Sequence, residues 1–209
     1  MSDADQSSYT TRGEIDIHVD AVPIDPDAAI EDLVHRLDSA RGVLLSSSYE
    51  YPGRYTRWDM GFVDPPVAVT SQGDIVTAEA LNPRGEVLLS PVRQVIQELA
   101  HVSIVEENAD RLIFQIERPA DRFEEEERSR QPSSFAVIRA IVELFNGPDE
   151  HLGLYGAFGY DLAFQFEPID LKLVRPENQR DLVLYVPDEI IVVDHQGGIA
   201  ERRRYEFSY

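Results

Sequence analysis

Residues 182–207 read LVLYVPDEIIVVDHQGGIAERRRYEF, and this stretch decides the fold class of the chain. Apolar and β-branched residues concentrate in Leu182–Val186, Glu189–Asp194 and Ala200–Phe207, and Gln196-Gly197-Gly198 is a turn sequence. Strands joined by such a turn pair antiparallel, because a parallel pair needs a long crossover. The stretch therefore predicts three strands, the last two of them joined by this turn.

The rest of the chain mixes further strands with helices and shows no regular strand–helix alternation. One helix is expected to begin at Asp25-Pro26, a second to open at Pro91, and a third to follow a cap at Ser133 or Ser134 and to close at Gly147. This order predicts an α+β fold with mixed, largely antiparallel sheets and packed helices. The further predicted strands cover the alternation of Ile15, Ile17 and Val19, and residues 43–47, 66–70, 75–81, 102–106 and 112–117.

Charge and proline content suggest how the chain is divided. Residues 1–12 are polar and are expected to be a disordered tail. Residues 119–132, PADRFEEEERSRQP, are highly charged and bounded by prolines, which predicts an acidic linker or insertion. Residues 13–118 then form one region, and residues 133–209 continue the same domain.

Composition limits the possible partners. The chain has 209 residues, 43% of them hydrophobic, with a formal net charge of −20. Nucleic acid and anionic membranes are not expected as partners, because a phosphate backbone requires a basic face. The absence of cysteine excludes disulfides and thiolate chemistry. Neither a secretory leader nor a membrane-spanning run is present, so a cytoplasmic protein is the default expectation.

The stretch LLSSSYEYPGRYTRW at 44–58 is the strongest candidate for a binding site. It passes from a short apolar strand into a loop with hydroxyl groups, two arginines and four aromatic rings. An arginine can hold a carboxylate through two hydrogen bonds or lie on an aromatic face. These groups together suit an aromatic amino acid, although the same composition also occurs in ordinary surface loops.

Other motifs favour less specific interpretations. The five histidines are scattered without metal-ligand spacing, so no metal site is expected. The glycines of GLYGAFGYD at 153–161 match no phosphate-binding motif and are interpreted as sites of close backbone packing. No GxSxG motif surrounds Ser46–Ser48, so the serines are assigned to recognition and no catalytic residue is predicted.

Four segments together resemble the N-terminal part of the large subunit of anthranilate synthase, particularly the form fused to a glutamine amidotransferase. They are LLSSSYEYPGRYTRWDMGFVDPP at 44–66, GDIVTAEALNPRGEVLL at 73–89, GLYGAFGYDLAFQFEPIDLKL at 153–173 and RDLVLYVPDEIIVVDH at 180–195. The resemblance implies an incomplete portion of the chorismate-utilising fold. It also implies a parent enzyme, a lyase of tryptophan biosynthesis that makes anthranilate and pyruvate from chorismate and an ammonia source.

The resemblance carries further expectations for the parent. They are Mg²⁺ with ligands outside this chain, a glutamine amidotransferase domain or subunit as partner, a homo-oligomer, and feedback inhibition by L-tryptophan. Because the family's catalytic elements lie further along, this chain alone is expected to be inactive.

The resemblance also points to site residues. The family's LLES motif matches residues 44–47, so Ser47 corresponds to a tryptophan-contacting serine and Ser46 replaces the usual glutamate. Arg57 stands where many relatives carry lysine, and GRYT at 53–56 resembles a GRYS turn. The expected L-tryptophan contacts are Leu45, Ser46, Ser47, Tyr55, Thr56 and Arg57.

Three alternatives stay open at this point. Aminodeoxychorismate, isochorismate and phenazine-pathway synthases share the same architecture, and the product formed by the complete enzyme would separate them. A stand-alone amino-acid-binding module is the second alternative, and the coding sequence after Tyr209 would decide. A purely structural α+β domain is the third, and no amino acid would then shift its thermal stability.

Overall fold

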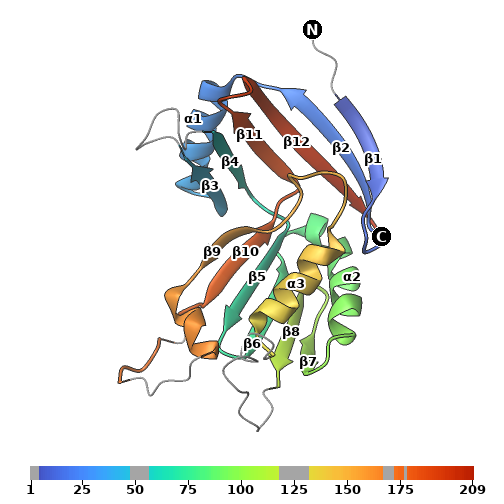
Figure 1. Ribbon diagram of the computed structural model, residues 1–209, viewed down its shortest axis with the longest axis vertical. Helices are drawn as coiled ribbons and strands as arrows, with labels where there is room; N and C mark the ends of the chain where they lie inside the picture. Colours follow the sequence, from blue (N-terminus) through green and yellow to red (C-terminus); the bar gives the residue numbers. More distant parts are fainter. Residues whose placement is uncertain (1–4, 48–56, 118–131, 167–171, 177) are drawn as a thin grey trace.

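Two six-stranded antiparallel sheets form the framework of the protein (Figure 1). The computed structural model describes residues 5–47, 57–117, 132–166, 172–176 and 178–209. The first sheet has the strand order β1-β2-β12-β11-β4-β3. Its strands are β1 (Asp5–Thr10), β2 (Asp16–Pro23), β12 (Ile199–Ser208), β11 (Glu189–Asp194), β4 (Trp58–Val63) and β3 (Gly42–Ser46).

The second sheet is built from the middle of the chain and from two later strands. Its order is β7-β8-β6-β5-β10-β9. Strands from both halves of the sequence therefore contribute to each sheet. The strands are β7 (Val102–Glu107), β8 (Arg111–Ile116), β6 (Ile75–Ala80), β5 (Val67–Gln72), β10 (Leu182–Val186) and β9 (Tyr155–Phe158).

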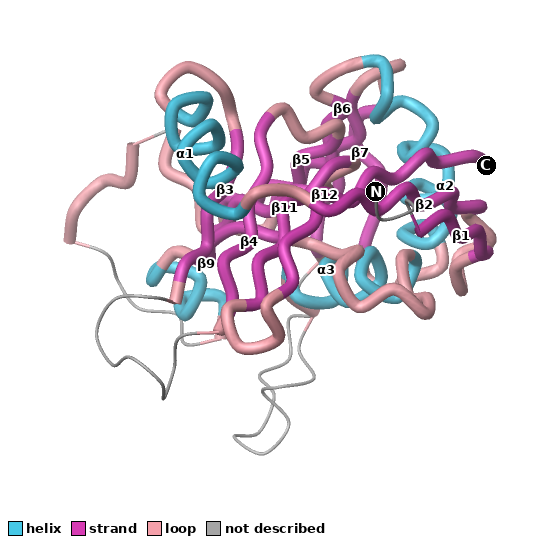
Figure 2. The backbone as a smooth tube through the Cα atoms, turned by 90° about the horizontal axis from the view of Figure 1, so that it is seen from above, coloured by secondary structure: helices cyan, strands magenta, loops and turns pink. Residues whose placement is uncertain are grey.

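Helices cover the sheets on different sides (Figures 1 and 2). Helix α1 (Pro26–Leu37) packs on β3, β4 and β11 of the first sheet, whereas α2 (Glu86–Gln97) and α3 (Ser134–Leu144) pack on each other and on the second sheet. Asp25 caps α1 as predicted, because its Oδ1 accepts a hydrogen bond from the Ala28 N–H at 2.9 Å. Two short 3₁₀ helices complete the described elements, η1 (Pro83–Gly85) and η3 (Tyr160–Gln165).

One large core joins the two sheets with α2 and α3. Fully buried side chains from β2, β8, β11 and both helices belong to this one cluster, including Ile17, Phe114, Ile190, Leu88 and Ile141. A smaller cluster around Leu33 packs α1 on the opposite face of the first sheet. The predicted α+β class, with antiparallel sheets and packed helices, is confirmed.

The predicted disordered tail is wrong for residues 5–10. These residues form β1, which pairs with β2 in register from Asp5 opposite Ala21 to Thr10 opposite Asp16. Tyr9 packs against the large core, while polar neighbours on the strand stay exposed. A half-buried edge strand of this kind has a single large apolar residue, so its sequence resembles a polar tail.

The predicted binding loop extends through Trp58, but β4 already begins at that residue. The register of β4 places Asp59 opposite Ser46 of β3 and opposite Val193 of β11. A buried carboxylate within a strand obscures the alternation on which a strand prediction depends.

The second helix begins earlier than its prediction at Pro91, because α2 starts at Glu86 and contains Pro91 in its interior. Proline there removes the hydrogen bond to the carbonyl of Val87. The buried row of Leu88, Val92 and Ile96 offsets this loss, because these side chains lie four residues apart on one face.

The third helix differs from its prediction only at its ends. Ser133 is the N-cap residue of α3 but makes no capping bond, and the helix ends at Leu144 rather than at Gly147. The predicted insertion at 119–132 lies outside the described residues except for its last residue.

Candidate functional site

The predicted tryptophan contacts lie at the ends of two paired strands. Leu45 and Ser46 are the last residues of β3, Ser47 follows them, and Arg57 directly precedes β4. Tyr55 and Thr56 are outside the described residues, as are Arg54 and Ser48. The structure thus brings together four of the six predicted residues at one corner of the first sheet.

Ser47 closes this corner through its hydroxyl. Its Oγ accepts hydrogen bonds from the N–H groups of Arg57 and Trp58 at 3.2 Å each, and donates one to the carbonyl of Trp58 at 3.0 Å. The Ser47 N–H also donates to that carbonyl, at 3.3 Å. One side chain therefore fixes the two ends of the segment 48–56 side by side.

Arg57 is held by a residue far away in the sequence. Its Nε lies 3.3 Å from both carboxylate oxygens of Asp194, and its Nη2 lies 3.1 Å from Oδ2. The guanidinium carbon lies 4.6 Å from the centroid of the Trp58 ring, which is a cation–π distance. The hydrogen bonds from Arg57, and then those from the Gly197 backbone, lower the pKa of Asp194 below its ordinary value.

His195 anchors the same strand end from the next position of the chain. Its Nε2 lies 2.7 Å from Oδ2 of Asp59, and its backbone N–H donates to the Arg57 carbonyl at 2.8 Å. The other Asp59 oxygen is buried without a hydrogen-bond partner among the described residues. Successive residues of a strand point to opposite faces, so Asp194 and His195 support the start of β4 from its two sides.

The corner also presents apolar groups. The Leu45 side chain is 46% exposed, and it lies opposite Met60 in the pairing of β3 with β4. The Trp58 ring contacts the His151 ring edge-on at a centroid distance of 6.0 Å. Ser46 lies opposite Asp59 in the same pairing of strands. Hydroxyl, guanidinium and apolar groups are thus found at the same end of the β3–β4 pair.

The residues that sequence reasoning missed are Asp194, His195, Asp59 and His151. Asp194, His195 and His151 lie far from the loop in the sequence, 137 residues from Arg57 in the case of Asp194, and so leave no spacing signal, whereas Asp59 directly follows the loop. The sequence holds one weak signal, because an acidic residue and a histidine end an otherwise apolar strand within the segment 180–195 that carries the family resemblance.

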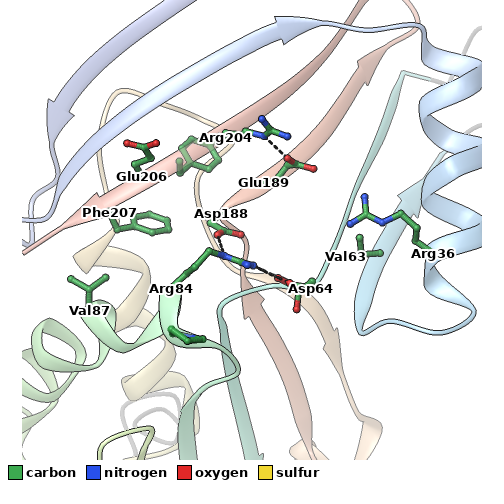
Figure 3. Close-up of a pocket in the computed structure, with 12 residues that line it drawn as sticks. Arg36, Val63, Asp64, Arg84, Val87, Asp188, Glu189, Arg204, Glu206 and Phe207 are labelled. Atoms are coloured by element: carbon green, nitrogen blue, oxygen red, sulfur yellow. Dashed lines mark hydrogen bonds and ion pairs between the residues drawn. The ribbon is translucent and has the colours of Figure 1, made fainter.

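A cavity of about 590 Å³ lies elsewhere, between η1, β12 and the end of α1 (Figure 3). Its arginines already have acidic partners: Arg84 binds Asp188 and Asp64, and Arg204 binds Glu189. Paired charges of this kind offer little to a charged ligand. The corner at Ser47 and Arg57 is therefore the stronger candidate site, despite the size of this cavity.

The described residues offer neither a metal cluster nor a helical membrane span. No group of three or more histidine and acidic side chains among these residues could hold a metal ion. No described helix is long and apolar enough to cross a membrane.

The glycine segment 153–161 serves backbone packing at two of its glycines. A Cβ at Gly156 would lie 2.0 Å from the Val183 carbonyl oxygen, and one at Gly159 would lie 3.0 Å from that of Asp181. The interpretation as close packing is confirmed at these positions. It is wrong for Gly153, where a Cβ would meet nothing within 4 Å.

Comparison with known proteins identifies the relatives of the chain. It is 47% identical over 200 residues to "Anthranilate synthase" of Azospirillum brasilense, a match covering 95% of this chain and 27% of that protein. It is 31% identical over 180 residues to "Anthranilate synthase component 1" of Vibrio cholerae, covering 84% of this chain and 34% of the relative. A more distant match, 23% identical over 152 residues, is "Anthranilate synthase component 1, pyocyanine specific" of Pseudomonas aeruginosa, covering 73% of this chain and 28% of the relative. No family model matches the chain.

The chain thus spans about a third or less of the length of the relatives it matches. The match to the Azospirillum protein covers 95% of the present chain, and so includes the corner formed by β3, β4 and β11. The chain belongs to the family of anthranilate synthase component 1 and corresponds to part of the length of the family's members.

Proposed function

We propose that this chain is the N-terminal, L-tryptophan-sensing part of an anthranilate synthase. The complete enzyme would convert chorismate and glutamine-derived ammonia into anthranilate and pyruvate, as the family does with Mg²⁺ and an amidotransferase domain or subunit. In this proposal the present chain supplies regulation and no catalytic residue.

The observation that carries the proposal is the joining of Ser47 and Arg57 at one strand corner. The hydroxyl of Ser47 connects the strand ends, and Arg57 lies on Trp58 with about half of its side chain exposed to solvent. The sequence alone points to both residues, independently of their proximity. The antiparallel pairing of β3 with β4, in which Ser46 lies opposite Asp59, brings the two residues together.

The chemistry of the corner suits the proposed inhibitor. The guanidinium is a planar donor of several hydrogen bonds and matches a carboxylate. The Ser46 hydroxyl can accept a hydrogen bond from an ammonium group, whereas the Ser47 oxygen already accepts from two backbone N–H groups and holds the corner together. The exposed Leu45 side chain offers an apolar surface to an indole ring. We assign the carboxylate of tryptophan to Arg57, its ammonium group to the end of β3 at Ser46, and its ring to the exposed Leu45 side chain. Ser47 joins the two strand ends that carry these groups.

Inhibition would follow from a difference in affinity between two states of the enzyme. Tryptophan bound at this corner favours an arrangement with poor affinity for chorismate. Linkage then requires that chorismate weakens tryptophan binding by the same factor.

The test is inhibition of the complete synthase carrying Ser47→Ala or Arg57→Ala. Each variant should raise the tryptophan concentration needed for half-inhibition by roughly tenfold, as expected for the loss of one charge-assisted or shared hydrogen bond. Turnover without tryptophan should stay close to that of the wild type. Unchanged inhibition in both variants would refute the site, and a product other than anthranilate would refute the assigned reaction.

A further inference from the structure

We infer that Asp194 is a positioning residue for the ligand carboxylate, and that it acts through Arg57. It holds the guanidinium by its Nε side and leaves the terminal edge for a carboxylate. This inference rests on the proposed tryptophan site and adds to it the residue that prepares Arg57 for the ligand.

Asp194 is itself held firmly. Its side chain is only 7% exposed, and its Oδ1 accepts hydrogen bonds from the backbone N–H groups of Gln196 and Gly197 at 3.0 Å each. A Cβ at position 197 would come within 2.8 Å of Oδ2, so glycine leaves room for the carboxylate. The turn after β11 therefore fixes Asp194 independently of Arg57.

Arg57 is consequently restrained on one edge and on one face. Nε and Nη2 point to Asp194, and the plane of the guanidinium lies near the Trp58 ring. Nη1 makes no hydrogen bond to a described residue, and the side chain is 51% exposed. A guanidinium can bind a carboxylate in paired fashion through its Nε/Nη2 edge, which Asp194 occupies, or through its Nη1/Nη2 edge, which faces no described acceptor at Nη1.

Restraint of this kind favours binding for a physical reason. A free arginine side chain loses rotamer freedom when it binds a ligand, and this loss opposes affinity. Asp194 and Trp58 impose most of that order before the ligand arrives. The benefit applies only to a ligand that uses the guanidinium, so it selects amino acids with a free carboxylate over their amides.

An opposite role is conceivable, in which the ligand carboxylate displaces Asp194 from Arg57. Removing the charge of Asp194 would then strengthen binding. The burial of Asp194 and its two backbone hydrogen bonds argue against displacement, because the vacated carboxylate would be left buried without its arginine.

The experiment compares L-tryptophan with L-tryptophanamide, which lacks the carboxylate, as inhibitors of the complete synthase. Asp194→Asn keeps the shape and an acceptor for the turn but loses the charge. It should raise the half-inhibitory concentration of tryptophan about tenfold and leave that of the amide within about twofold. The matched control is Asp188→Asn, which removes another aspartate–arginine pair just before the start of β11 and should change neither value.

A double-mutant cycle tests whether Asp194 acts through Arg57. In an Arg57→Ala background, Asp194→Asn should change tryptophan inhibition by less than about twofold. An equal loss for tryptophan and its amide, a full tenfold effect without Arg57, or tighter binding in Asp194→Asn would each overturn the inference. If the wild type is not inhibited by tryptophan at all, the proposed function fails instead.

A second variant covers the case in which Asp194→Asn does not fold. Trp58→Leu keeps apolar bulk but removes the aromatic face beside the guanidinium. It should weaken inhibition by tryptophan about threefold, with no comparable change for the amide. Equal inhibition by tryptophan in this variant and in the wild type would contradict the positioning of Arg57.

Discussion

Ser47 and Trp58 form a closed hydrogen-bonded pair: the Ser47 hydroxyl donates to the Trp58 carbonyl at 3.0 Å and accepts from the Trp58 N–H at 3.2 Å. The pair fixes both ends of the segment that links β3 to β4. The proposed binding corner therefore depends on a serine whose side chain is used by the backbone. This contact predicts a structural cost when the hydroxyl is removed, besides any effect on the ligand.

Ser47→Ala should lower the free energy of unfolding by about 1 kcal/mol, because two backbone N–H groups lose their acceptor near the surface. Urea unfolding monitored by tryptophan fluorescence measures this change. Ser39→Ala is the control, since the Ser39 hydroxyl makes only a 3.5 Å contact to the Arg36 carbonyl. Equal stability of the two variants would contradict the structural role of Ser47.

Ile141→Ala should lower the free energy of unfolding by about 2–5 kcal/mol, because it leaves a cavity in the core between α3 and the sheets. The Ile141 side chain is fully buried, whereas the neighbouring Val142 is 47% exposed. Val142→Ala on the same helix should cost less than about 1 kcal/mol. Urea unfolding of the pair checks both values, and similar losses in the two variants would argue against the assigned helix face.

Gly156→Ala should disrupt the pairing of β9 with β10. The added methyl group would lie 2.0 Å from the Val183 carbonyl oxygen, a distance that requires the strand to move. Gly153→Ala, three residues earlier, meets nothing within 4 Å and should be tolerated. Hydrogen exchange of the β9 and β10 amides measures the effect. Protection that is the same in both variants would contradict the close approach of the two strands at Gly156.

Alkaline pH should destabilise the protein between pH 10 and 12. Burial, with the negative charge of Asp149, raises the pKa of Tyr9 and of Tyr155 from 10.0 to about 12 each. Above pH 10 the unfolded chain loses these protons while the folded protein keeps them. The folded state then binds more protons, so stability falls as pH rises.

Tyr9→Phe tests this linkage. The Tyr9 hydroxyl is buried without a hydrogen-bond partner among the described residues, so its removal should cost little stability at pH 8. Between pH 10 and 12 the variant should lose stability less steeply than the wild type. Parallel pH profiles from urea unfolding would show that Tyr9 does not contribute.

The sequence predicted the elements whose signals are local. Asp25 followed by proline marked the start of α1, and the turn at Gln196-Gly197-Gly198 separated β11 from β12. Prediction from the sequence was wrong where tertiary contacts determine the bounds of an element. Pro91 indicated a helix start, yet the burial of Leu88 before it extends α2 toward the N-terminus.

The same distinction applies to the candidate site. Ser47 and Arg57 could be selected from the sequence, because a family motif and the chemistry of a carboxylate ligand pointed to them. Asp194 and His195 could not, since only the pairing of β11 with β4 brings them to the corner. A residue that acts through another residue leaves no motif of its own.

The most direct measurement is a calorimetric titration of the complete synthase with L-tryptophan, for the wild type and for Arg57→Ala. Wild-type enzyme should bind tryptophan, and the variant should bind it about tenfold more weakly or worse, because the guanidinium holds the ligand carboxylate. Addition of chorismate should weaken binding to the wild type. Identical dissociation constants in the two proteins would contradict the assignment of this corner as the tryptophan site.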